Sequence, residues 1–292
     1  MPEMINPLRY PGAKRTLVNY VDELLHANNL QGCCFLEPYA GSAAVGLELL
    51  QRGSIDTLVL CERDVLIYSL WKSIFTQTED LCTRVQETPI TIDTWRQLDL
   101  YRNVTDPRQD SVLELGFAGL FFNRTNFSGI LKANPIGGMA QDSPYKIDCR
   151  FNKNKLMTII RRLAQYRDRV EVHYDDALAF MRSQNPRFLR ESCFAYLDPP
   201  YYGKGSEIYR CFYAESDHTA LSRYVSDIRH LDWIISYDDA PFIHALYENS
   251  GVQYRPFFMD YSCAPGARSQ GKELLISNLR LPPFAIGKAA EL

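Results

Sequence analysis

The chain has 292 residues, 46% of them hydrophobic, and a net charge of −3 at neutral pH. This length and hydrophobic content allow a full core, which argues against an intrinsically disordered protein. No apolar run approaches the roughly 20 residues of a membrane-spanning helix, and the N-terminus lacks a signal-peptide pattern. We therefore expect a soluble, cytoplasmic protein, and we take a monomer as the default.

The first half of the chain alternates strands and helices. Residues 31–53 read as a short apolar strand, a turn of small residues and an amphipathic helix closed by Gly53. A second strand over 56–62 and a helix over 65–75 follow. This βαβα order predicts a mostly parallel sheet covered by helices.

The middle of the chain changes character after a helical region that ends near Phe122. Residues 123–150 hold several glycines and prolines among polar residues, which predicts a long irregular segment. We expect an insertion over 78–152 that splits one sheet domain into 1–77 and 153–292.

The sheet resumes in the second half with four predicted strands. They lie within residues 169–174, 192–202, 231–239 and 272–279.

Charge is distributed unevenly along the chain. The overall charge of −3 argues mildly against a nucleic-acid partner, because phosphate binding needs lysine and arginine. Between Arg124 and Arg169, however, ten basic residues stand against three acidic ones, so this stretch carries +7 and the remainder −10. A solvated surface and a nucleic-acid contact are equally compatible with such a stretch on its own.

The cysteines and histidines show no metal-binding pattern. The eight cysteines include the adjacent Cys33 and Cys34 but no Cys-x-x-Cys pair, and the five histidines have no ligand spacing. We expect reduced thiols and no metal.

The stretch AYLDPPYY is the most informative for chemistry, because an apolar strand brings Asp198 to its carboxyl end. Pro199 and Pro200 fix the backbone and contribute carbonyls but no N–H donors, and Tyr201 adds a flat ring. The Asp198 carboxylate and the Pro199 carbonyl can together accept both hydrogens of an amino group and turn its lone pair outward. The alternative is a turn that merely ends a strand.

Four stretches together resemble the Dam-type DNA adenine methyltransferases. NPLRYPGAKR is similar to that family's opening motif, FLEPYAGSAAV to its cofactor turn, FFNRTNFSGI to its target-recognition segment and LDPPYY to its catalytic motif. The order of these motifs also matches. The resemblance implies a Rossmann-like methyltransferase sheet, mostly parallel with one antiparallel strand, and an inserted, mainly helical target-recognition region.

The same resemblance implies methyl transfer from S-adenosylmethionine to the 6-amino group of a flipped adenine in double-stranded DNA. The catalytic residues implied are Asp198, Pro199, Pro200 and Tyr201, with Tyr201 stacking on the base. Tyr202 is a second stacking candidate, and residues 201–209 suit a lid. No metal or covalent intermediate is required.

The cofactor turn EPYAGSAAVG lacks G-x-G-x-x-G, which disfavours a nicotinamide dinucleotide. The acidic Glu62, where the family usually has Asp-x-Asn, is expected to hold ribose hydroxyls. Asp176 matches the position that holds the cofactor's adenine, and Asp175 is its alternative. The full set of candidate cofactor residues is Tyr10, Lys14, Glu37, Pro38, Tyr39, Gly41, Ser42, Glu62, Asp176 and Asp198.

The recognition segment, residues 121–138, opens the basic stretch. Its polar donors and one aromatic ring suit contacts with bases and phosphates. The candidate DNA-binding residues are Asn123, Arg124, Asn126, Phe127 and Lys132. An ordered polar loop that closes the cofactor site is the alternative.

Several functions remain open on these motifs. The same chemistry on RNA adenine or on the cytosine amino group is one alternative, and a non-catalytic nucleic-acid-binding relative is another. The Asn-Pro-Pro-Tyr variant that acts on glutamine is disfavoured by Asp198. The recognition sequence is not readable, nor is the biological setting, such as restriction-modification in a prokaryotic nucleoid or a phage-infected cell.

Overall fold

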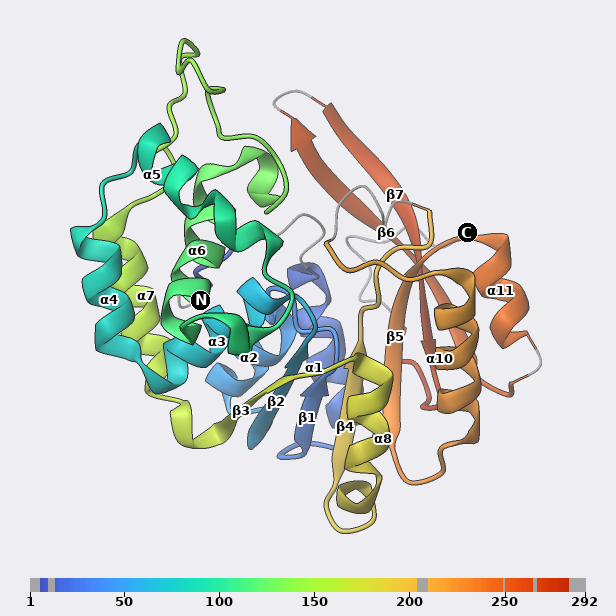
Figure 1. Cartoon of the computed structure of the whole chain (residues 1–292). Coiled ribbons are helices and arrows are strands. Elements are labelled where there is room, and N and C mark those ends of the chain that lie inside the picture. Colours follow the sequence, from blue (N-terminus) through green and yellow to red (C-terminus); the bar gives the residue numbers. More distant parts are fainter. Residues whose placement is uncertain (1–5, 10–13, 204–209, 249, 265–266, 284–292) are drawn as a thin grey trace. The chain divides into compact units, whose positions relative to one another are not determined.

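The computed structural model describes residues 6–9, 14–203, 210–248, 250–264 and 267–283 (Figure 1). The side chains of Arg15 and of residues 258–271 are outside this description. The chain divides into two compact units. Unit 1 comprises Met1–Ala13 and Glu62–Tyr174, and unit 2 comprises Lys14–Cys61 and Asp175–Leu292. The predicted insertion, residues 78–152, lies within unit 1.

Seven strands form one sheet in the order β3-β2-β1-β4-β5-β7-β6. Their bounds are β1 Cys34–Glu37, β2 Thr57–Glu62, β3 Val170–Tyr174, β4 Cys193–Leu197, β5 Asp232–Asp238, β6 Gln253–Ala264 and β7 Ala267–Ser277. Strands β2, β1, β4 and β5 pair in parallel, whereas β7 runs antiparallel to both β5 and β6. The expected Rossmann-like, mostly parallel sheet with one antiparallel strand is confirmed.

Helices cover the sheet of unit 2. They are η1 Arg15–Leu17, α1 Val18–Ala27, α2 Ala44–Arg52, α8 Ala177–Phe188, α10 Glu215–Asp227 and α11 Pro241–Tyr247. Alternate strand residues such as Leu36 and Trp233 pack with Leu178, Leu221 and Ile243, which come from α8, α10 and α11. These helices therefore cover the face to which Leu36 points, and α10 lies beside β5 in Figure 1.

Several helices of unit 1, namely α4, α6 and α7, pack against α3. Their bounds are α3 Val65–Thr76, α4 Thr78–Glu87, α5 Ile92–Leu98, η2 Asp99–Asn103, η3 Pro107–Gln109, α6 Val112–Thr125, η4 Phe127–Gly129, α7 Lys153–Ala164 and η5 Arg167–Arg169. A Cβ atom at Gly116 would lie 2.6 Å from the carbonyl oxygen of Ser69, and one at Gly119 would lie 2.6 Å from that of Leu66. Both glycines thus let the backbones of α3 and α6 approach each other.

Local sequence signals mark where these elements end and begin, and the end at Gly53 is as predicted. Helix α2 ends at Gly53, whose φ of 77° is in the left-handed region that glycine tolerates. Asp64 begins α3 by accepting a hydrogen bond from the backbone N–H of Leu66. Between Asn126 and Asn152 the described chain contains only the short η4 and an isolated bridge between Asn126 and Pro135. The predicted irregular segment over 123–150 is therefore confirmed from Asn126 onward, whereas its first three residues belong to α6.

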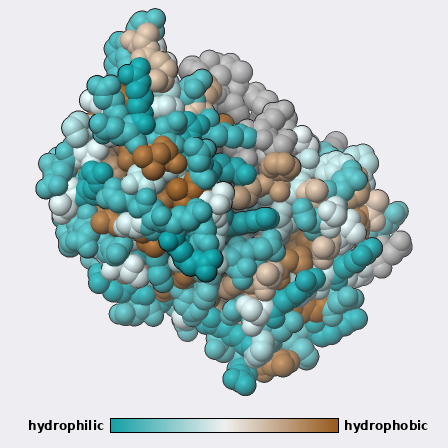
Figure 2. All heavy atoms as spheres, viewed as in Figure 1, coloured by the Kyte–Doolittle hydropathy of each residue, from teal (hydrophilic) through white to brown (hydrophobic). Residues whose placement is uncertain are grey.

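Hydrophilic residues cover much of the face in Figure 2, with hydrophobic patches between them. Within the described residues, none of the helices combines the length and the apolar character that crossing a membrane requires.

Candidate functional site

The turn between β1 and α2 is built from small residues because the helix lies close to the strands. A Cβ atom at Gly46 would lie 2.4 Å from Leu58 Cδ1 and 3.2 Å from Glu37 Oε1. Gly41 and Ala43 have φ values of 45° and 48°, so the chain turns sharply here. Pro38, Gly41 and Ser42 are buried in this turn, which therefore brings backbone rather than bulky side chains to the end of β1.

Glu37 ends β1 with its side chain inside the protein, where only 3% of the residue is exposed. Its Oε1 accepts a hydrogen bond of 2.7 Å from the backbone N–H of Gly46. Burial raises the pKa of Glu37 to about 8, the Gly46 bond lowers it, and the charge of Asp198 raises it. The carboxyl group is therefore placed to favour a positively charged neighbour.

Asp198 follows directly after β4, at the carboxyl end of the parallel strands. Its Oδ1 accepts a hydrogen bond of 2.7 Å from Ser236 Oγ in β5, and Ser236 Oγ lies 3.1 Å from the Tyr196 hydroxyl. All the contacts found for Asp198 among the described residues involve Oδ1. The second carboxylate oxygen, Oδ2, is therefore available to a ligand.

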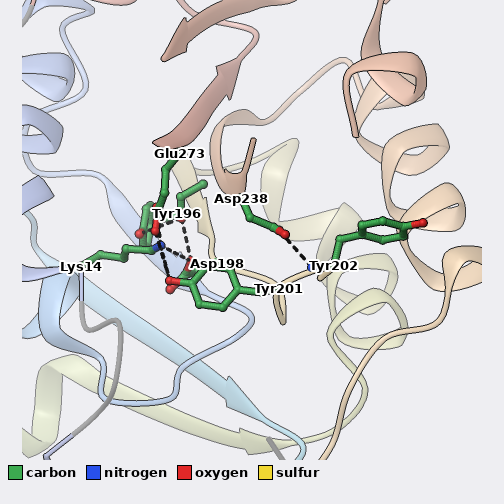
Figure 3. A network of polar contacts seen from close by, with 8 residues as sticks. Lys14, Tyr196, Asp198, Tyr201, Tyr202, Asp238 and Glu273 are labelled. Atoms are coloured by element: carbon green, nitrogen blue, oxygen red, sulfur yellow. Dashed lines mark hydrogen bonds and ion pairs between the residues drawn. The ribbon is translucent and has the colours of Figure 1, made fainter. Parts of the chain in front are cut away.

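Lys14 links Asp198 and Tyr201, which follow β4, to Glu273 in β7 (Figure 3). Its ammonium lies 2.5 Å from Glu273 Oε2, 2.9 Å from the Tyr201 hydroxyl and 3.7 Å from Asp198 Oδ1. The Tyr201 hydroxyl in turn donates to Glu273 Oε1 over 3.2 Å. Two carboxylates thus share one buried ammonium.

The groups around Asp198 shift its pKa in opposite directions. Burial raises the pKa of Asp198, Lys14 and the Ser236 hydrogen bond lower it, and the charge of Glu273 raises it. Lys14 therefore favours the ionised form that accepts hydrogen bonds, while Glu273 holds Lys14 in position.

Asp238, at the end of β5, fixes the backbone after Tyr201. Its Oδ1 accepts a hydrogen bond of 2.9 Å from the N–H group of Tyr202 (Figure 3). Its Oδ2 accepts one of 3.0 Å from the N–H group of Gly203. The Tyr202 ring stacks on Phe242 with 4.8 Å between centroids. The Asp-Pro-Pro-Tyr turn is thus tied to the neighbouring strand. The remainder of the predicted lid, residues 204–209, lies outside the described residues.

Other predicted cofactor residues have defined surroundings. Asp176 begins α8 and accepts hydrogen bonds from the backbone N–H groups of Leu178 and Ala179. Burial is the main cause that raises the pKa of Tyr39, and the charge of Asp176 adds to it. Asp176 is half-buried and Asp175 is exposed, and the choice between them as a cofactor residue stays a prediction.

Two further cofactor predictions have less structural context. Glu62 ends β2, and its Oε1 accepts a hydrogen bond of 2.7 Å from the backbone N–H of Asp64. Tyr10 lies outside the described residues.

Two predicted DNA-binding residues of unit 1 are buried and engaged within the protein. The Asn123 amide bonds both peptide groups of Arg9 at 2.7 Å, and also the Gly129 carbonyl at 3.0 Å. The Asn126 amide accepts from Trp95 Nε1 at 2.7 Å and donates to two loop carbonyls. Both asparagines have no exposed surface. Contact with a base would require this region to open.

The remaining residues of the recognition segment are more accessible. Phe127 is 62% exposed, Lys132 is exposed and Arg124 is half-buried. Contact of these three residues with a nucleic acid stays a prediction.

Two polar residues of the site, Ser236 and Glu273, were not among the sequence predictions. Each is a polar residue inside a predicted apolar strand, ISYDD and KELLISNL respectively. Such a residue is a signal of a buried interaction. Only the register, however, places Ser236 opposite Leu275 and Glu273 opposite Asp238.

One group of side chains has metal-ligating atoms close together. In the part of the chain that is described, the ligand atoms of Cys34, Glu191 and Cys193 lie within 4.8 Å of one another. Cys34 and Cys193 begin β1 and β4, at the ends opposite Glu37 and Asp198.

The model of one protein family, described as D12 class N6 adenine-specific DNA methyltransferase, matches residues 10–256. The matched region includes all the predicted site residues but not Glu273. None of the curated proteins compared with the chain matches it.

Proposed function

Because the chain belongs to the family of D12 class N6 adenine-specific DNA methyltransferases, we propose that Asp198 and the Pro199 carbonyl hold a flipped adenine for methylation by S-adenosylmethionine. The enzyme class and its DNA substrate follow from the family. The observation that carries the mechanism is the arrangement of Asp198, whose Oδ1 is held by Ser236 and Lys14. Its Oδ2 is thereby left for the substrate.

The proposed step needs an amino group whose lone pair is free to attack. The adenine 6-amino group is a poor nucleophile, because its lone pair is delocalised into the ring. One hydrogen bond to Asp198 Oδ2 and one to the Pro199 carbonyl would occupy both N–H groups and favour a pyramidal nitrogen. Positioning and electrostatics then supply most of the rate enhancement.

The residues after β1 fit S-adenosylmethionine, which carries a sulfonium and an ammonium cation. The buried carboxyl group of Glu37 has a raised pKa, so a nearby cation would restore its charge. When bound, the cofactor supplies the electrophilic methyl group. We assign Glu37 to the recognition of its positive charge and retain Tyr39, Gly41, Ser42 and Asp176 as residues that line its site.

Tyr201 has two tasks in this proposal. Its hydroxyl belongs to the Lys14 and Glu273 cluster, and its ring is to stack on the flipped base. Only 9% of Tyr201 is exposed, so binding of the base requires that the ring be uncovered. The hydroxyl contacts would keep the ring in a fixed plane during that change.

Lys14 acts in this proposal as a positioning residue. Its ammonium favours ionised Asp198 and bonds the Tyr201 hydroxyl, so it sets both groups that face the base. A direct contact with the cofactor remains a prediction for Lys14.

In unit 1, we propose that Arg124, Phe127 and Lys132 contact the DNA. Phe127 is an exposed ring suited to stacking or to insertion between bases. Lys132 offers a cation to a phosphate.

The test is incubation of the purified protein with S-adenosylmethionine and unmethylated DNA, followed by mass spectrometry of the digested nucleosides. The expected product is 6-methyladenine. Asp198→Ala should abolish its formation and leave most of the cofactor affinity, as measured by titration calorimetry. Methylation by the Asp198 variant would refute the assigned clamp.

A matched control is Asp232→Ala. Asp232 begins β5, whereas Ser236, which bonds Asp198, lies toward the other end of that strand. We expect this variant to methylate DNA at close to the wild-type rate.

A further inference from the structure

Three arginines of unit 1 form what we name the arginine triad: Arg9, Arg124 and Arg150. Arg124 lies in the last turn of α6, Arg150 shortly before α7, and Arg9 in the segment that precedes η1. Arg9 and Arg124 are half-buried, and Arg150 is exposed. The triad therefore reaches from the interior of the unit to its surface.

The backbone of Arg9 is fastened next to Arg124. The neighbouring Asn123 forms two hydrogen bonds of 2.7 Å with the peptide groups of Arg9. Gly129 adopts a φ of +77°, and a Cβ atom there would lie 2.3 Å from the Arg9 carbonyl oxygen. A glycine and an asparagine thus hold two cationic residues together against their mutual repulsion.

Electrostatics show that the three guanidinium groups act on one another. Burial, together with the charges of Arg9 and Arg150, lowers the pKa of Arg124 to about 10. Burial also lowers the pKa of Arg9, again with a contribution from Arg150. Like charges gathered in this way favour an anionic partner.

Within the described residues, no carboxylate forms an ion pair with any member of the triad. Other arginines of unit 1 do pair with carboxylates: Arg84 with Glu114, Arg102 with Asp99 and Arg161 with Glu79. Two buried donors of the triad, Arg9 Nη1 and Arg124 Nε, also have no hydrogen-bond acceptor. Buried donors of this kind normally have a partner, so the triad lacks an anion that accepts hydrogen bonds.

We propose that the arginine triad binds one backbone phosphate of the DNA, an inference that rests on the proposed function. A phosphodiester offers a negative charge and oxygens that match the planar, forked donors of guanidinium groups. Such a contact sets the position of the protein on the duplex without reading its sequence. Asn123 is then a positioning residue of the phosphate site.

The experiment compares Arg124→Gln, Arg150→Gln and their double variant with the wild type in binding to two duplexes of unrelated sequence. Affinity is measured by fluorescence anisotropy over a series of salt concentrations. The logarithm of affinity falls linearly with the logarithm of salt concentration, and each single variant should reduce the steepness of this slope by about one. The reduction should be equal on both duplexes. Because all three residues hold one phosphate, the double variant should reduce this slope by no more than about one in total.

The matched control is Arg162→Gln, which removes the same charge from an exposed position on α7 of the same unit. It should leave the slope at the wild-type value. An equal loss in this control would assign the effect to net charge and would overturn the site. Thermal unfolding checks the fold, and Arg124→Gln should unfold at or above the wild-type temperature because repulsion is relieved.

Free phosphate has the same chemistry as the DNA backbone and is tested separately. The comparison is the thermal stability in phosphate and in chloride at equal ionic strength. If phosphate stabilises the wild type more than chloride, and Arg124→Gln removes that effect but leaves the affinity for the duplexes unchanged, the site binds a free anion. That result would overturn the assignment to DNA.

The failure of this inference is distinguishable from failure of the proposed function. Formation of 6-methyladenine by the wild type, with salt slopes unchanged in all the triad variants, would refute the triad alone. Absence of 6-methyladenine with a reduced salt slope in the triad variants would refute the catalytic proposal and leave the phosphate site standing.

Discussion

Replacing Glu37 by glutamine should make the protein more stable relative to the wild type as the pH rises. Glu37 is buried at the end of β1, where its pKa is raised from 4.5 to about 8. Its Oε1 accepts a hydrogen bond from Gly46, and the amide oxygen of glutamine can do the same. The substitution therefore removes the titratable carboxyl group and keeps a side chain of nearly the same shape.

The sign follows from proton uptake in the two states. The unfolded chain releases the Glu37 proton near pH 4.5, but the folded protein keeps it until about pH 8. Between these values the folded state binds more protons, so the wild type loses stability as pH increases, and the loss levels off above about pH 8. At roughly 1.4 kcal/mol per pH unit, the wild type should lose about 2.5 kcal/mol relative to Glu37→Gln between about pH 6 and about pH 8.5.

The assay is urea unfolding of both proteins, followed by circular dichroism, at several pH values in this range. Any constant effect of the substitution on packing cancels when the difference in unfolding free energy is plotted against pH. A difference that does not change with pH would mean that Glu37 titrates alike in both states. The interpretation of Glu37 as a buried carboxyl group that favours binding of a cation would then be wrong.

Three other predictions concern the cofactor, the buried ion pair and the packing of unit 1. The affinity for S-adenosylmethionine should fall as pH decreases below about 8, because binding then requires loss of the Glu37 proton. Calorimetry of Glu37→Gln should show an affinity that depends less on pH. Glu273→Ala should reduce the unfolding free energy by about 3–5 kcal/mol, since it leaves the Lys14 ammonium buried without its nearest carboxylate. In urea titrations, a double variant with Lys14→Met should recover part of that loss. Gly116→Ala should destabilise by about 1–3 kcal/mol in thermal unfolding, because its methyl group would meet the backbone carbonyl of Ser69, and an unchanged midpoint would contradict this packing.

The recognition segment illustrates the limits of interpreting polar residues from sequence. Asn123 and Asn126 stand beside Arg124 in a basic stretch, and the sequence predicted that they contact DNA. In the structure their amides satisfy backbone groups and Trp95 inside unit 1. An asparagine can serve its own backbone or a ligand equally well, and only the surrounding fold distinguishes the two.

Glu273 was missed for a related reason. It lies in a predicted apolar strand, and nothing nearby in the sequence pairs it with Lys14, 259 residues away. The antiparallel insertion of β7 beside β5 brings it opposite Asp238, at the end of the sheet where Asp198 emerges. The charge balance around Asp198 is therefore a product of sheet topology.

Local patterns were sufficient for the strand and helix alternation, the stop at Gly53 and the position of Asp198 at the end of an apolar strand. These features depend on hydrophobic periodicity and backbone preference, which act over a few residues. The burial of Glu37, the sharing of one ammonium by two carboxylates and the gathering of Arg9, Arg124 and Arg150 depend on contacts between distant segments. Their electrostatics arise from desolvation and from charges brought close by folding, so only the tertiary structure decides them.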